Sequence, residues 1–85
     1  MREIKFTTIA FSQLEQWQLE DKKVFIRIEK LLDYIQTNPF TGIGKPEPLK
    51  FELSGYWSRR ITKQDRLIYK ITTNEIIVIS CKYHY

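Results

Sequence analysis

The side chains best suited to proton transfer lie far apart along the chain. Its only histidine, His84, is the second-to-last residue and is followed by Tyr85. Imidazole titrates near neutrality, so it can donate or accept a proton at cellular pH. Glu47 lies between two prolines, Pro46 and Pro48. A carboxylate and an imidazole can serve as the base and the acid of a single reaction.

Cationic side chains accompany these two groups. Arg59, Arg60 and Arg66 fall on segments that alternate like strands. A guanidinium offers a fixed fork of donors to phosphoryl oxygens. Together with a carboxylate and an imidazole in a small basic domain, the arginines indicate metal-free cleavage of RNA. In that reaction the 2′-hydroxyl attacks the neighbouring phosphorus, which leaves a 2′,3′-cyclic phosphate and a 5′-hydroxyl end.

We assign Glu47 as the general base that takes the proton of the 2′-hydroxyl, and His84 as the general acid that protonates the departing 5′-oxygen. Arg66 is assigned as the main clamp on the charge of the transition state. Three further side chains would hold the RNA: Lys50, Arg60 and Tyr85. One His, one Cys and scattered acids make no ligand cluster, so we expect no metal and no other cofactor.

The composition predicts one small domain, residues 1–85. Its 14 Lys and Arg against 10 Asp and Glu give a net charge of +4, which fits an anionic partner such as RNA. The single cysteine, Cys81, falls on an apolar segment, where a buried thiol in a reducing, cytoplasmic compartment is expected. The longest aliphatic run, Ile76 to Ile79, is too short to cross a membrane, and the charged N-terminus does not resemble a signal peptide.

Apolar periodicity predicts two helices after a short opening strand around residues 3–6. The first helix spans residues 9–18. The second follows the N-cap Asp21 and ends near Thr37, because Asn38-Pro39 stops it. Apolar residues at helical spacing mark the two buried faces: Ala10, Leu14 and Trp17, then Phe25, Ile28, Leu32 and Ile35.

The second half of the chain has the period of strands. We predict strands over residues 49–53, 56–61, 66–71 and 75–83, with Ser54-Gly55 as a two-residue hairpin turn. Both element types have apolar stripes to bury. The sequence therefore predicts an α+β fold, with two N-terminal helices packed on one face of a four- to five-stranded antiparallel sheet.

Alternation along the strands assigns side chains to the two faces of the sheet. Arg60, Arg66 and His84 fall on the uncovered face. Arg59 falls on the covered face with Trp57, so we favour Arg60 for the site; a β-bulge would reverse that choice. On the last strand the same count turns three residues inward, Ile77, Ile79 and Cys81, and three outward, Val78, Ser80 and Lys82.

These residues belong to a longer pattern that closely resembles the Txe/YoeB family of bacterial toxins, within the RelE-like superfamily of type II toxin–antitoxin systems. Four segments carry the resemblance: residues 38–50, 53–61, 66–69 and 81–85. It implies a compact microbial-ribonuclease-like fold and an endoribonuclease that cuts mRNA in the ribosomal A site, which inhibits translation.

The resemblance also implies roles and partners. Glu47 matches the family's base, His84 its acid and Arg66 its assisting arginine. The matching RNA-binding positions are Lys50, Arg60 and Tyr85. The implied partners are mRNA and the ribosome, a cognate antitoxin whose disordered acidic segment wraps the toxin, and a second copy in a homodimer.

Blander alternatives remain. Glu47 could be an exposed carboxylate without a role, His84 part of a frayed terminus, and the arginines ordinary strand charges. The chain would then be a non-catalytic toxin of the same fold, an RNA- or ribosome-binding module, or a structural partner protein. A binding module would keep its function after replacement of Glu47 and His84.

Overall fold

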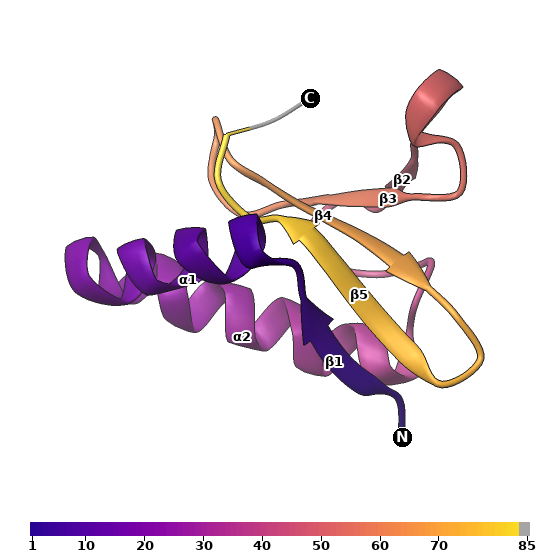
Figure 1. Cartoon of the computed structure of the whole chain (residues 1–85), viewed down its shortest axis with the longest axis horizontal. Coiled ribbons are helices and arrows are strands. Elements are labelled where there is room, and N and C mark those ends of the chain that lie inside the picture. Colours follow the sequence, from indigo (N-terminus) through magenta and orange to yellow (C-terminus); the bar gives the residue numbers. More distant parts are fainter. Residues whose placement is uncertain (84–85) are drawn as a thin grey trace.

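Two helices cover one face of a five-stranded sheet in residues 1–83, the part of the chain that this computed structural model describes (Figure 1). His84 and Tyr85 lie outside the described residues. In chain order the elements are β1 (Glu3–Phe6), α1 (Thr8–Glu20), α2 (Lys22–Thr37), β2 (Glu47–Pro48), the 3-10 helix η1 (Phe51–Leu53), β3 (Trp57–Arg60), β4 (Arg66–Ile71) and β5 (Glu75–Ser80).

Both predicted helices form, and side-chain caps set where they begin. At the start of α1 the Thr7 hydroxyl accepts a hydrogen bond from Ala10 N (3.2 Å). Asp21 lies between the helices and caps α2 through its carboxylate. α2 ends at Thr37, before Asn38-Pro39, as predicted, whereas α1 extends beyond its predicted range at both ends. Neither helix is long and apolar enough to span a membrane, and no other helix in residues 1–83 is.

All the buried apolar side chains of the described residues except Ile68 form one cluster between the helices and the sheet. The helices contribute Ala10, Ile28, Leu31, Leu32 and Ile35, and the rest of the cluster comes from Ile61, Leu67, Tyr69, Ile76, Val78 and Cys81. Trp17 and Trp57 pack against it, which confirms their prediction as core residues. Burial of such large side chains contributes roughly 1.5–3 kcal/mol each, so this cluster fixes the helices on the sheet.

The sheet is mixed rather than antiparallel. Its strand order is β1-β5-β4-β3-β2, and β1 runs parallel to β5, with Ile4 opposite Ile76 and Phe6 opposite Val78. The prediction of an antiparallel sheet is therefore wrong for this strand. A short alternating segment carries no information about the direction of its neighbour, and the long connection through both helices permits parallel pairing.

The predicted strand over residues 49–53 is also wrong. β2 contains only Glu47 and Pro48, and the chain then forms η1 before it returns as β3, so Ser54-Gly55 does not join two paired strands directly. Phe51 has a left-handed backbone (φ +59°) and is 87 % exposed. That backbone breaks the alternation, and η1 projects away from the helices (Figure 1). Glu47, which lies outside the strands predicted from the sequence, is on the short strand β2.

The side-chain faces predicted for Ile76 to Ile79 on β5 are reversed in the structure. Ile76 and Val78 are buried in the core, whereas Ile77 and Ile79, predicted to point inward, are only half-buried. The prediction for Ile76 to Ile79 is wrong because a register shift interrupts the ladder: Tyr69 pairs with Val78, but Ile68 pairs with Ser80. The extra residue reverses the alternation. Beyond it, Cys81 is buried and Ser80 shares the face of Ile68, as predicted.

β5 ends at Ser80. The prediction that this strand continues to residue 83 is wrong. Lys82, predicted on the uncovered face, instead contacts α1, where its Nζ lies 3.2 Å from Gln16 Oε1 and 3.4 Å from Glu20 Oε1. The chain leaves the sheet because α1 offers polar partners there. Alternation along β5 therefore no longer assigns a face to His84, which lies outside the described residues.

The thiol of Cys81 lies in the core and is shielded from water. Its side chain is fully buried, and Sγ lies 3.6 Å from Ala10 O. Desolvation, reinforced by the negative charge of Asp65, raises the pKa of the Cys81 thiol to about 12. The thiolate is the reactive form of cysteine, so folding should suppress its reactivity.

We expect the folded protein to resist disulfide-exchange labelling at pH 8 and the urea-unfolded protein to react at once. The raised pKa also means that the folded state holds the thiol proton more tightly. This contribution to the free energy of unfolding is present below the ordinary thiol pKa of 9.0 and is lost as the pH rises toward 12. Cys81→Ala should lack this loss. Equal labelling of folded and unfolded protein would contradict the prediction.

Candidate active site

Strand register brings Glu47 and two arginines to the sheet face that the helices leave open. Glu47 pairs with Ser58, and two residues along β3 Arg60 pairs with Arg66. Residues two apart on a strand share a face, so all three candidates project from the same side. From strand spacing, the Cα atoms of Glu47 and Arg66 are about 12 Å apart. A phosphate between them is within reach of both side chains.

Arg60 and Arg66 face each other across β3 and β4. Like charges directly opposite destabilise a sheet. Arg66 donates from Nη1 to Thr62 O and Asp65 O (both 3.2 Å). Within residues 1–83, no ion pair joins either arginine to a carboxylate. Two facing guanidiniums without a carboxylate form a cationic patch suited to an anion such as a phosphate.

Lys50 lies on the other side of Glu47 from the arginines. Its side chain is exposed, and it immediately precedes η1. Along the hairpin of β2 and β3, Glu47 is therefore flanked by Arg60 at one end and by Lys50 at the other. Within the described part of the chain, His, Cys, Asp and Glu side chains form no group of three that could hold a metal ion.

Arg59, the alternative to Arg60, is a buried structural residue. It is 0 % exposed, and its Nε donates to Tyr69 OH (3.0 Å). Its other donors are taken by backbone carbonyls, those of Asn38, Thr41 and Ile43. The covered position predicted for Arg59 is confirmed. Arg59 therefore anchors the loop that runs from α2 toward β2.

This loop reaches the sheet at Gly44, where a side chain would be crowded and the backbone strained. Gly44 has φ +83°, and a Cβ there would lie 3.1 Å from Arg59 Cβ. The bare backbone lets Gly44 O accept a hydrogen bond from Arg60 N (2.7 Å). The loop thus enters alongside β3 and leads directly into Glu47.

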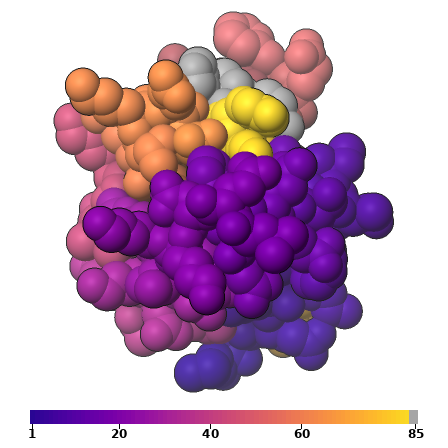
Figure 2. Space-filling view, turned by 90° about the vertical axis from the view of Figure 1, so that its left-hand side faces the viewer, coloured from indigo at the N-terminus to yellow at the C-terminus, as the bar shows by residue number. Residues whose placement is uncertain are grey.

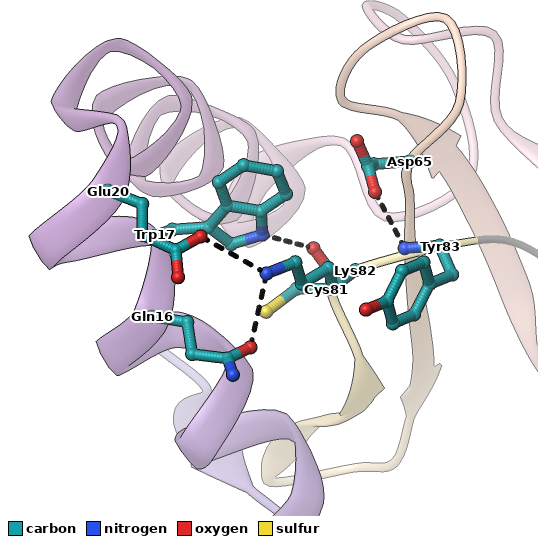
Figure 3. A network of polar contacts seen from close by, with 7 residues as sticks. All are labelled: Gln16, Trp17, Glu20, Asp65, Cys81, Lys82 and Tyr83. Atoms are coloured by element: carbon teal, nitrogen blue, oxygen red, sulfur yellow. Dashed lines mark hydrogen bonds and ion pairs between the residues drawn. The ribbon is translucent and has the colours of Figure 1, made fainter.

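The C-terminal end of the described chain lies against the residue proposed as the clamp. Arg66 N donates to Tyr83 O (2.8 Å). Tyr83 N donates to Asp65 Oδ1 (2.6 Å), as Figure 3 shows. Strand alternation assigns no role to Asp65, which lies between the predicted strands over residues 56–61 and 66–71. Its spacing from Thr62 is typical of reciprocal side-chain and backbone hydrogen bonds, which was the available signal. His84 and Tyr85 follow Tyr83 in the sequence, outside the described residues.

Known proteins share this fold over nearly the whole chain. The solved YoeB/ParE toxin from Agrobacterium tumefaciens has a TM-score of 0.94 and 38% identity, covering 98% of this chain and 99% of that one. The YoeB dimer from Staphylococcus aureus has a TM-score of 0.92 and 45% identity, covering 99% and 98%. Toxin YoeB of Synechocystis is 49% identical over 82 residues, which covers 96% of this chain and 95% of the relative. Toxin RelK of Mycobacterium tuberculosis is 46% identical over the full length of both.

The fold and these likenesses define the class of protein: a small α+β toxin of a bacterial type II toxin–antitoxin system. Residues 6–85 match the family described as YoeB-like toxins of such systems. The chain belongs to this YoeB-like toxin family, as the resemblance in its sequence predicted.

The two adjacent arginines should differ sharply in their effect on stability. Arg59→Met should lower the free energy of unfolding by about 3 kcal/mol or more, because the fully buried guanidinium is lost and four acceptors lose their donor. Arg60→Met is the matched control and should change it by less than about 0.5 kcal/mol, as is usual for exposed positions. Urea unfolding monitored by tryptophan fluorescence measures both. Equal losses for the two variants would refute the anchoring role of Arg59.

Proposed function

We propose that this toxin is a metal-independent endoribonuclease that cleaves mRNA in the ribosomal A site and so inhibits translation. The observation that carries the proposal is the shared open face of Glu47, Arg60 and Arg66, set by the pairing of β2, β3 and β4. The ribosomal setting rests on the resemblance to the family.

In the proposed reaction Glu47 takes the proton of a 2′-hydroxyl, and that oxygen attacks the adjacent phosphorus. The bond to the 5′-oxygen breaks, and His84 protonates the departing oxygen. Arg66 balances the charge that develops on the phosphoryl oxygens. The products are a 2′,3′-cyclic phosphate and a 5′-hydroxyl. The assignment of His84 as the acid is supported by its neighbour in the sequence, Tyr83, whose carbonyl accepts a hydrogen bond from Arg66 N.

The remaining cations suit the flanking RNA. Arg60 faces Arg66 directly, and Lys50 lies beyond Glu47 along the hairpin. Phosphates on either side of the scissile bond would meet one cation each, so the strand would run along the open face. We propose that Tyr85, the last residue, stacks on a base or assists at the leaving group.

Glu47 and His84 should be essential for cleavage but not for folding. Glu47→Gln and His84→Gln should each lower the rate of ribosome-bound mRNA cleavage by about 10²–10⁴-fold, the usual contribution of a general base or acid. Glu52→Gln, an exposed acid on the neighbouring η1, is the matched control and should cleave like the wild type. Primer extension on ribosome-bound mRNA and growth arrest on induction measure the effect.

The same experiment separates the enzyme from a binding module. If both variants remain folded and still arrest growth, the chain acts by binding rather than by cleavage. If only His84→Gln keeps full activity, the enzyme remains and the acid is another group.

We further propose that the toxin forms a homodimer and is neutralised by a cognate antitoxin with a disordered acidic segment. The S. aureus YoeB structures include a dimer and a heterotetrameric YoeB–YefM toxin–antitoxin complex. The +4 charge of this chain and its facing arginines suit an acidic partner.

Light scattering on the purified Glu47→Gln protein should give twice the mass of one chain. Co-expression of the antitoxin should abolish growth arrest by the wild type. A single-chain mass at every concentration would refute the dimer.

A further inference from the structure

Beyond β5 the chain is held by hydrogen bonds to backbone groups rather than by a sheet. Cys81 N donates to Gln13 Oε1 (2.7 Å), and Cys81 O accepts from the indole Nε1 of Trp17 (2.8 Å). The Ser80 hydroxyl donates to Lys82 O (3.1 Å). Figure 3 shows α1 supplying the contacts on one side of this segment. Residues 81–83 therefore have a defined path although no strand continues through them.

The turn between β3 and β4 holds the other side of the segment. Asp65 Oδ1 accepts from Tyr83 N at 2.6 Å, the length of a charge-assisted bond. The next residue, Arg66, donates its backbone N–H to Tyr83 O (2.8 Å). In Figure 2 this turn, in orange, lies beside the last described residues, in yellow, above the helices. Both backbone hydrogen-bonding groups of Tyr83 are thus held by two consecutive residues.

The conformation of Tyr83 is unfavourable without these bonds. Its φ is +63°, a left-handed backbone that a bulky residue rarely adopts. Its side chain is 67 % exposed, so packing does not hold it in place. An unfavourable conformation persists only where the surroundings over-determine it, and such residues cluster at functional sites. The two hydrogen bonds from Asp65 and Arg66 supply that constraint.

The two carboxylate oxygens of Asp65 have separate partners. Oδ2 accepts from the Thr62 hydroxyl (2.7 Å) within the turn, whereas Oδ1 accepts from Tyr83 N. Asp65 is only 8 % exposed. A carboxylate is costly to bury unless its hydrogen bonds are satisfied. The turn contact and the contact to Tyr83 can therefore be removed separately.

We propose that Asp65 is a positioning residue, whose carboxylate fixes the backbone of Tyr83, the residue immediately before the proposed acid His84, and that the acid cannot act at full rate without this constraint. The inference rests on the proposed function, because it assigns to His84 the role of the acid. Asp65 does not itself contact RNA in this scheme. The same turn presents Arg66, the proposed clamp, and holds Tyr83, the residue that precedes the proposed acid.

Three variants test this role on ribosome-bound mRNA. Asp65→Ala should lower the cleavage rate at saturating toxin by about 10- to 100-fold, the effect of a catalytic group displaced by roughly 1 Å, and leave the half-saturating concentration within threefold. Asp65→Asn keeps an acceptor for Tyr83 N and should recover most of the rate. Thr62→Val removes the hydroxyl that donates to Asp65 Oδ2 and accepts from Gln64 N and Asp65 N, all within the turn, and leaves the acceptor of Tyr83 N in place. This matched control should cleave within threefold of the wild type.

Amide hydrogen exchange supplies a readout independent of cleavage. In the catalytically inactive Glu47→Gln background, adding Asp65→Ala should speed exchange of the Tyr83 amide at least tenfold, while that of Leu67 in the core of β4 stays unchanged. If Asp65→Ala does not fold, the donor of this hydrogen bond, the Tyr83 N–H, can be removed chemically instead. Ligation at the native Cys81 allows an ester to replace the Lys82–Tyr83 peptide bond, and this protein should show the same loss of rate.

The outcomes separate the two proposals. If Glu47→Gln is inactive but Asp65→Ala and the ester protein cleave like the wild type, the positioning role is wrong and the proposed function stands. Loss of rate in Thr62→Val equal to that in Asp65→Ala, or unchanged exchange at Tyr83, also overturns the positioning role. If wild type and Glu47→Gln cleave alike, the proposed function fails and the role of Asp65 falls with it.

Discussion

The guanidinium of Arg59 is the contact on which the arrangement of the open face depends. It is fully buried, and its donors go to the Tyr69 hydroxyl and to three carbonyls of the loop after α2. Burial raises the pKa of Tyr69, and the hydrogen bond from Arg59 offsets this only in part. The Tyr69 phenol donates to Pro39 O (2.8 Å). A charge without a carboxylate partner is tolerable inside a protein only when its donors are satisfied. The loop is therefore tied to β3, and it delivers Glu47 to the sheet edge.

Consecutive arginines on β3 have different environments because they point to opposite faces of the sheet. Arg59 is neutralised by carbonyl dipoles on the helix side, whereas Arg60 meets Arg66 on the open side. Arg59 stabilises the fold, whereas the repulsion between Arg60 and Arg66 destabilises it. A charge arrangement that reduces stability and has no carboxylate partner among residues 1–83 is typical of a surface that binds an anion, here the proposed RNA backbone.

The proposed active site gathers groups from both ends of the second half of the chain. Glu47 arrives on an edge strand of two residues, and the segment before His84 returns between α1 and the turn at Asp65. Neither approach uses a long strand. Short, individually anchored segments can place a side chain accurately only when their backbone groups are satisfied locally, as they are at Gly44 and Tyr83.

The sequence by itself determined the two helices, because caps and apolar spacing act within a few residues, and it placed Arg60 and Arg66 on one face by alternation. It also carried the family pattern. Tertiary structure alone decided the parallel pairing of β1, the replacement of a predicted strand by η1, and the register shift that turns Ile76 and Val78 inward. These features depend on contacts between residues distant in sequence. The alternation of side chains along a strand carries no information about an inserted residue in the ladder. It also carries none about the side chains of α1 that draw residues 81–83 away from the sheet.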